Sequence, residues 1–258
     1  MKKIWLTSLG SSKEEVQKTM AALKKVGLAI DGHFWQDDLD KMAWSAPRQA
    51  ILDKNINLWV VLASSTDLQS PSIRYGLSML ALTVQAAKGI DFPIIILQNA
   101  GETILPETLP TPLAGCDIFD LNNPAYGAKI VARAHKTVQG TLPPYRLDVY
   151  GIAQIGQWFE IGPREGKWSG ALFGSSDAGP CLHTVGRSGQ LPEKSVLNYQ
   201  QRGLEIELQG RKFTAWAVQN ELDAESSYYV KVDGRPDSIL FSPYSSGEEA
   251  EVFVVKLK

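Results

Sequence analysis

The chain has 258 residues, enough for one large domain or two ordinary ones, and 44% of them are hydrophobic. Its 26 basic and 28 acidic residues give a net charge of −2, which argues against nucleic acid and anionic lipid as partners. The first residues are too polar for a signal peptide, and no later run approaches the ~20 apolar residues of a membrane span. We therefore expect a soluble, cytoplasmic protein without membrane contact.

The cysteines and histidines predict neither a disulfide framework nor a metal site. Cys116 and Cys181 fall in different halves of the chain, and we expect both to be buried thiols. His33, His135 and His183 lie far apart and have no companion at metal-binding spacing. Each histidine is therefore interpreted as a structural or surface residue.

Strand-like and helix-like segments alternate up to about residue 140. This alternation predicts a doubly wound parallel sheet with helices on both faces. The runs at 56–63 and 93–97 are apolar almost throughout, which is typical of central strands covered on both faces. The expected strands are 4–9, 28–34, 56–63, 93–97 and 117–120, and the expected helices are 12–26, 46–54, 72–88 and 125–139.

The first expected helix has matching signals at its two ends. Ser12 and Glu15 have the spacing of a capping box, and Gly27 is suited to the left-handed residue that ends a helix. Between them, apolar residues recur at helical spacing and predict one buried stripe. These residues are Val16, Met20, Leu23 and Val26.

After the sequence TLPPY at 141–145, nearly every segment alternates with a period of two and is interrupted by Gly, Pro, Asn or Asp. This pattern predicts an all-β sandwich or small barrel of roughly eight strands. We therefore expect an α/β domain at 1–140 and a β domain at 145–258, joined at Pro143 and Pro144. The expected strands are 158–162, 167–174, 195–200, 204–208, 212–218, 227–232, 238–242 and 250–257.

Polar residues follow the first three expected strands. Ligands of open α/β sheets collect at the carboxyl ends of the strands, where the strand order reverses. Hydroxyl groups and helix N-terminal amides suit a phosphate or ribose, a carboxylate can accept from ribose hydroxyls, and a tryptophan can stack on a base. In the alternative interpretation, these residues cap helices and turns, and the tryptophan packs under its loop. They are Ser8, Gly10 and Ser11, then Trp35, Asp37 and Asp38, then Ser64, Ser65, Thr66 and Asp67.

Three common catalytic motifs are absent from the sequence. The first strand-to-helix turn reads SLGSSK and lacks the spaced glycines of a dinucleotide fingerprint. The sequence contains no GxxxxGK[ST] phosphate-binding loop and no GxSxG nucleophile elbow. A Rossmann dehydrogenase, a P-loop enzyme and a serine hydrolase are therefore disfavoured.

Residues 1–140 resemble a TIR domain, a flavodoxin-like α/β fold. The resemblance rests on the loop FWQDD, Trp44, the helix with Ala50 and Ile51, the strand INLWVVLASS and the following Ser-Pro-Ser helix start. Enzymatic members carry a Trp-Cys pair and then a Glu on this helix, and the Glu acts on the ribose side of NAD. Here the pair corresponds to Arg74 and Tyr75, and the Glu position corresponds to Ser78.

The segment 67–93 is also loosely similar to nucleoside deoxyribosyltransferase-like proteins. Their DxGTAxEIGYAxAxGKP motif is matched through Asp67, Ser72 and Gly76, and its nucleophilic Glu corresponds to Arg74. Both resemblances therefore imply the loss of the carboxylate that displacement at an anomeric carbon requires. Arg74 could instead bind a phosphate, or it could pair with Asp67.

The sequence therefore predicts a TIR-like signalling or nucleotide-sensing module that self-associates and lacks the usual catalytic carboxylate. Alternatives are an NAD or nucleoside N-glycosidase that uses Asp37 or Asp38, and a scaffold protein without a ligand. No cofactor is expected to be required, although NAD or another nucleotide is a candidate ligand or substrate. The candidate ligand-binding residues are Ser8, Ser11, Trp35, Asp37, Ser64, Asp67, Arg74 and Ser78.

Overall fold

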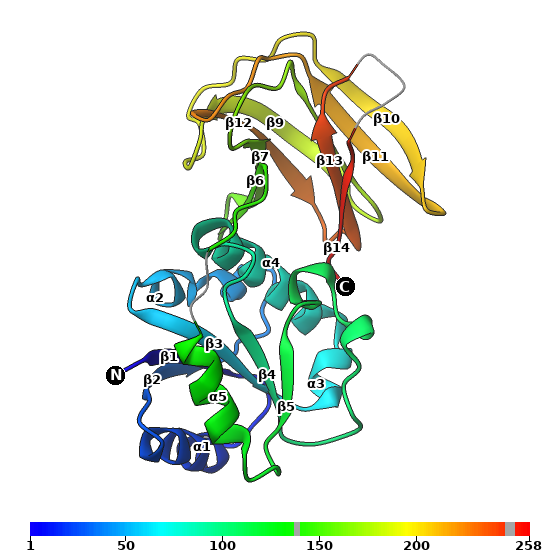
Figure 1. Ribbon diagram of the computed structural model, residues 1–258. Helices are drawn as coiled ribbons and strands as arrows, with labels where there is room; N and C mark the ends of the chain where they lie inside the picture. The colour runs from blue at the N-terminus through cyan, green and yellow to red at the C-terminus, as the bar shows by residue number, and fades with distance from the viewer. Residues whose placement is uncertain (137–139, 246–250) are drawn as a thin grey trace. The chain divides into compact units, whose positions relative to one another are not determined.

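The computed structural model describes residues 1–136, 140–245 and 251–258. The chain divides into two compact units, Met1–Thr141 and Leu142–Lys258 (Figure 1). We call them the α/β unit and the β unit.

The α/β unit contains a five-stranded, all-parallel sheet in the order β2-β1-β3-β4-β5. This sheet confirms the predicted α/β fold class. The order is that of flavodoxin-like folds. The chain places β2 on one side of β1 and the later strands on the other side, so the strand order reverses between β1 and β3. The strands are β1 (Lys3–Ser8), β2 (Ala29–Phe34), β3 (Ile56–Ala63), β4 (Ile94–Gln98) and β5 (Asp117–Asp120).

Helices flank this sheet (Figure 1). Pro71 occupies the first turn of the longest helix, where its missing N–H group costs no hydrogen bond. No helix in the described ranges combines the length and apolar character needed to cross a membrane. The helices are α1 (Lys13–Lys25), α2 (Arg48–Leu52), α3 (Ser65–Gln69), α4 (Pro71–Lys88) and α5 (Tyr126–His135), with 3-10 turns η1 (Ala43–Ser45), η2 (Pro106–Thr108) and η3 (Thr111–Leu113).

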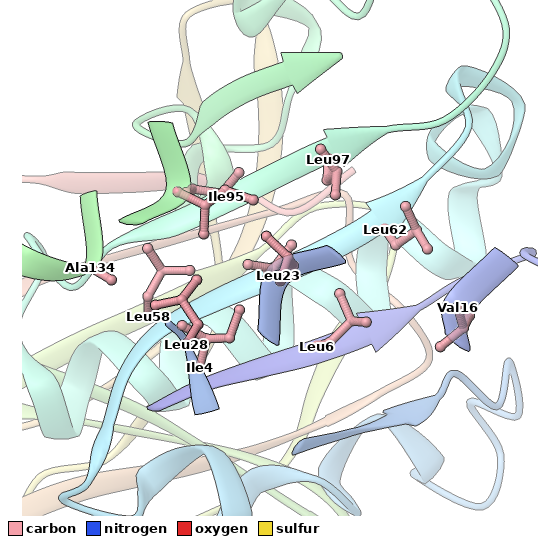
Figure 2. Packing of buried hydrophobic residues seen from close by; sticks show 12 residues of the cluster. Ile4, Leu6, Val16, Leu23, Leu28, Leu58, Leu62, Ile95, Leu97 and Ala134 are labelled. Atoms are coloured by element: carbon pink, nitrogen blue, oxygen red, sulfur yellow. The ribbon is translucent and has the colours of Figure 1, made fainter. Parts of the chain in front are cut away.

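The apolar core on one face of the sheet joins β1, β3 and β4 to α1 and α5 (Figure 2). Leu23 of α1 and Leu62 of β3 are fully buried there, and Ala134 contributes from α5. The burial of each large aliphatic side chain in such a core stabilises the fold by about 1.5–3 kcal/mol. This core therefore holds β1, β3 and β4 in place, and the turns that follow these strands form the candidate site.

Several predicted helix boundaries differ from the structure. The first helix ends with Val26 at its C-cap and 44% exposed, so this residue lies outside the buried stripe. Gly27 has a φ of 88°, as its predicted role requires. The short helix α3 was not predicted, and the helix expected to reach 139 ends at His135. The positions 137–139 of that expectation lie outside the described residues.

The β unit consists of two antiparallel sheets, as expected for an all-β region. Their orders are β10-β11-β8-β13-β14 and β6-β7-β12-β9. Phe159 of β7 and Phe173 of β8 are fully buried with ring centroids 5.2 Å apart, so the two sheets meet through their apolar faces. The strands are β6 (Tyr145–Ile152), β7 (Gly156–Pro163), β8 (Ala171–Ser175), β9 (Gly179–Arg187), β10 (Gln201–Leu208), β11 (Arg211–Val218), β12 (Ser226–Asp233), β13 (Ser238–Pro243) and β14 (Phe253–Lys256).

The strand expected at 195–200 is wrong, because no strand forms there and Tyr199 is 80% exposed. In that segment the Asn198 amide donates to the side chain of Asn220 rather than to a strand. Strands β6 and β9 were not predicted. The last expected strand begins at position 250, which lies outside the described residues.

Candidate functional site

The turns that follow β1, β3 and β4 meet at the carboxyl edge of the sheet. A Cβ atom on Gly10 would lie 2.6 Å from Oδ1 of Asp67, so a larger residue would displace this carboxylate. Asn99 donates its side-chain amide to Ser11 Oγ at 2.9 Å and to Glu15 Oε2 at 3.0 Å. The structure thus brings together the predicted Ser11 and Asp67 and adds Asn99, which the sequence analysis missed.

Glu15 has a different role from the one its spacing suggested. Ser12 caps α1, since its hydroxyl accepts from the Glu15 amide at 3.2 Å. The Glu15 carboxylate, however, is hydrogen-bonded to Asn99, so this side chain links the start of α1 to the end of β4. Only the Ser12 half of the predicted capping box is therefore present, and the Glu15 carboxylate belongs to the site.

Ser64 and Asp67 form a complete capping box at the start of α3. The Ser64 amide and hydroxyl both donate to Asp67 Oδ2 at 2.8 Å, and the Asp67 amide donates back to the hydroxyl at 3.0 Å. Both side chains therefore hold the turn after β3 in place. Asp67 Oδ1 faces the neighbouring turn at Gly10.

The loop after β2 packs against α4. The Trp35 amide donates to the Ser8 carbonyl at 2.8 Å, which ties the loop to β1. The Trp35 ring fills the space beside Gly76, where an added Cβ would lie 2.7 Å from Cζ2. Asp37 accepts a hydrogen bond from the Ser72 hydroxyl at 2.5 Å, so the loop also reaches the first turn of α4.

Asp38 is held by its own turn. Its carboxylate accepts from the backbone amide of Lys41 at 3.1 Å and from the ammonium group of Lys41 at 2.7 Å. These hydrogen bonds hold the pKa of Asp38 below its usual range, which makes the carboxylate a weaker base.

The Arg74 side chain is hydrogen-bonded to backbone carbonyl groups. Its guanidinium donates to the Leu68 carbonyl at 3.3 Å and to the Thr108 carbonyl at 2.5 Å, and burial lowers its pKa. The suggested pairing with Asp67 does not form, because that carboxylate is used in the capping box. Arg74 therefore links α3 to η2.

Ser78 lies in the fully buried part of α4. The ten consecutive residues from 75 to 84 are all buried, and Ser78 itself has 0% exposure. A helix that is buried on all sides presents no side chain to a ligand in solution. The position that the TIR resemblance assigns to a glutamate is therefore covered in this chain.

Three polar atoms at the carboxyl edge have no hydrogen-bond partner within the described residues. They are Oγ of Ser8, a residue with 1% exposure at the end of β1, Nε1 of Trp35 after β2 and Oδ1 of Asn99 after β4. Leaving such a group unpaired in the interior costs about 1–3 kcal/mol. Buried polar atoms without partners are uncommon in native folds, so these atoms mark the edge as a place where a ligand atom could be bound.

Charge at this edge favours hydroxyl groups over phosphates. Four carboxylates, those of Glu15, Asp37, Asp38 and Asp67, come from the turns and helix starts described above. The guanidinium of Arg74 is occupied by two backbone carbonyls. Carboxylates accept from ribose hydroxyls and attract a cationic ring, whereas they repel a phosphate.

His33 is a structural histidine beside the site. Its Nδ1 accepts from the Trp5 indole at 3.0 Å, and burial lowers its pKa to about 4. The unfolded chain binds the proton near pH 6.5, so between these values the unfolded state holds more protons than the fold. Stability is therefore full above about pH 6.5 and declines as the pH falls toward 4.

The change His33→Gln is expected to reduce this acid sensitivity. Wild-type protein should lose at most about 3 kcal/mol between pH 6.5 and 4 through this group, and the variant should lose correspondingly less. Urea unfolding across this pH range measures the difference. The matched control is His135→Gln, which removes an exposed imidazole and should leave the wild-type pH profile in place. Identical profiles for all three proteins would contradict the assignment.

Both cysteines are free thiols in partly exposed residues, and of the two expected buried thiols that of Cys116 is largely buried. Burial of the Cys116 thiol raises its pKa to about 12, so it stays protonated at neutral pH. A nucleophilic role is therefore unsupported for this residue.

No family model matches the chain, and no curated protein matches it.

Proposed function

We propose that the α/β unit is a TIR-like sensing module that binds the nucleoside portion of NAD or of another nucleotide at the carboxyl edge of its sheet. The observation that carries this proposal is the buried, unpartnered pair of Ser8 Oγ and Asn99 Oδ1. Ser8 ends β1, beside the point where the strand order reverses, and Asn99 follows β4, which is separated from β1 by β3 alone. Such sheets take their ligands at this point. The surrounding carboxylates are suited to ribose hydroxyls.

The same module is proposed to leave the glycosidic bond intact. Displacement at an anomeric carbon needs a carboxylate that attacks or stabilises the oxocarbenium-like centre. The two positions that family resemblance assigns to this group are Ser78, which is inaccessible, and Arg74, which is bound to backbone carbonyls. Asp38 is a weakened base, and Asp37 is hydrogen-bonded to Ser72. The N-glycosidase alternative is therefore the weaker proposal.

Ligand-induced stabilisation tests the binding proposal. A nucleotide at about 100 times its dissociation constant should stabilise the fold by about 2.7 kcal/mol. The panel is NAD, ADP-ribose and the common nucleosides, measured by thermal unfolding. The variant Asn99→Ala should weaken the affinity about tenfold, because it removes one ligand-facing acceptor, and the stabilisation at the same ligand concentration should fall to about 1.4 kcal/mol.

The matched control for this experiment is Asn122→Ala, which truncates an exposed asparagine in the same unit. It should respond to ligand as the wild-type protein does. A panel in which no compound stabilises the wild-type protein would favour the scaffold alternative over a sensing role. Equal responses of the two asparagine variants would place the ligand elsewhere.

Sensing would be coupled to self-association of the α/β unit. In this proposal, ligand binding orders the turns after β1, β3 and β4 and so favours one arrangement of the exposed edge. Sedimentation velocity of the full chain with and without the stabilising nucleotide measures this coupling. A ligand that binds without changing the sedimentation coefficient would limit the module to binding alone.

A further inference from the structure

A cavity of about 520 Å³ lies at the opposite, amino edge of the α/β sheet. Its volume is in the range of small-molecule sites. Four lysines line it: Lys2 precedes β1, Lys54 precedes β3, Lys88 ends α4 and Lys136 follows α5. No Asp or Glu occurs among the described residues that line this cavity. We call it the lysine pocket.

The positive charge of the lysine pocket exceeds what the fold itself neutralises. Helices α4 and α5 both end at this edge, and each C-terminus contributes about −0.5 charge. The carboxylate of Asp53 also interacts with Lys88, so four ammonium groups face roughly two negative equivalents, which leaves an excess of positive charge. The chain as a whole has a net charge of −2, so this excess is local. An anion in the pocket would relieve the repulsion among the lysines.

Lys88 is already held in place for such a ligand. Its ammonium group donates to the carbonyls of Asp53 at 2.7 Å and Ile56 at 2.9 Å, and it lies 4.9 Å from the centre of the Phe92 ring. An ammonium group has three N–H donors, so these carbonyls leave one. A cation fixed in this way loses little side-chain entropy when it binds a ligand.

The remainder of the pocket lining is mixed. Leu52, Ile56, Phe92 and Pro93 contribute apolar side chains, and Asn57 and His135 contribute polar ones. The lysine ammonium groups would bind the charged groups of a small molecule, and the rest of the lining would surround them.

We propose that the lysine pocket is a second ligand site, which binds a small molecule carrying two or more adjacent phosphate groups. Lysine ammonium groups act as point charges that suit phosphate oxygens without fixed geometry. This site is independent of the carboxyl edge, where the carboxylates disfavour phosphate. The α/β unit would therefore bind two chemically different ligands, one at each edge of its sheet. A phosphorylated lipid headgroup shares the chemistry, but a free oligophosphate is the ligand we assign.

Calorimetric titration of the full chain with inorganic tripolyphosphate tests this proposal. Wild-type protein should bind it at low salt, and the affinity should fall as ionic strength rises. The double variant Lys54→Glu with Lys136→Glu should weaken binding by about tenfold or more for each lysine. Its matched control, Lys18→Glu with Lys212→Glu, has the same change in net charge at exposed positions that do not line the pocket and should bind as the wild-type protein does.

A second readout needs no variant. Lysine acetylation of the wild-type protein, followed by mass spectrometry, should show that tripolyphosphate protects Lys2, Lys54 and Lys136 but leaves Lys18 reactive. Absence of binding at low salt, or equal binding by the two double variants, would overturn the proposal. Binding only to phosphatidylcholine vesicles that contain phosphatidylinositol bisphosphate, without binding of tripolyphosphate, would overturn the assignment to a free oligophosphate.

Discussion

Ser78→Glu is expected to destabilise the α/β unit by about 3–5 kcal/mol and to generate no glycosidase activity. The change restores a carboxylate at the position that the TIR resemblance assigns to the catalytic residue. Ser78 has 0% exposure, however, and its neighbours Leu77 and Met79 are buried as well. The new carboxylate would therefore lose its hydration in the interior. Hydrogen exchange of α4 and β3, read by mass spectrometry, measures the loss locally.

The matched control is Ala21→Glu, which adds the same side chain at an exposed position of α1. It should change stability by no more than about 0.5 kcal/mol. If Ser78→Glu were as stable as this control and released nicotinamide from NAD, position 78 would face a ligand cleft. That result would contradict both the burial of α4 and the proposed absence of chemistry.

Glu160→Ala is expected to destabilise the β unit by about 3–5 kcal/mol. Glu160 has 2% exposure and accepts from the Tyr150 hydroxyl at 2.6 Å, the Ser227 hydroxyl at 2.7 Å and the Gly189 amide at 3.0 Å. Nε of Arg146 lies 3.9 Å away and supplies the opposite charge. Removal of the carboxylate takes the nearest opposite charge away from a largely buried guanidinium, which keeps its hydrogen bonds to backbone carbonyls, and it removes the shared acceptor of three donors.

Hydrogen exchange of β6, β7 and β12 measures this loss, because these strands carry the network. Glu207→Ala on β10 is the matched control, since it removes an exposed carboxylate from the same unit, and it should have little effect. Glu160→Gln should fall between the two, because the amide keeps the shape and one acceptor but loses the charge. Equal protection in the Glu160 and Glu207 variants would show that the network contributes nothing.

The sheet of the α/β unit could be predicted because its signals are local. The run at 56–63 is apolar except for Asn57 and becomes β3, and Ser12 and Gly27 mark the ends of α1. The helix α3 could not be predicted in this way. It has only five residues, and a serine such as Ser64 is as typical of a turn as of a helix N-cap. Short elements of this kind are set by their neighbours rather than by periodicity.

The β unit shows the same limit. Strand β9 contains Gly179, Pro180 and Gly186, which indicate turns when they are read locally. Its pairing with β12 forms the strand despite these residues. The segment 195–200 is the opposite case. Its alternating pattern predicts a strand, but no strand forms because the segment has no strand partner.

The candidate site was predictable only in part. Ser11 and Asp67 could be placed at one edge, because the carboxyl ends of parallel strands meet there. Asn99 contacts Ser11 across 88 positions of the chain, and no local pattern marks such a contact. The partners of Arg74 were missed for the same reason, since the Thr108 carbonyl lies 34 positions away.

Equilibrium dialysis against NAD, with chromatography of both chambers, tests the central claim most directly. The account predicts an excess of intact NAD in the chamber that holds the protein and no free nicotinamide, even at high protein concentration. Equal NAD on both sides would contradict binding at the carboxyl edge, and free nicotinamide would contradict the proposed absence of glycosidase chemistry.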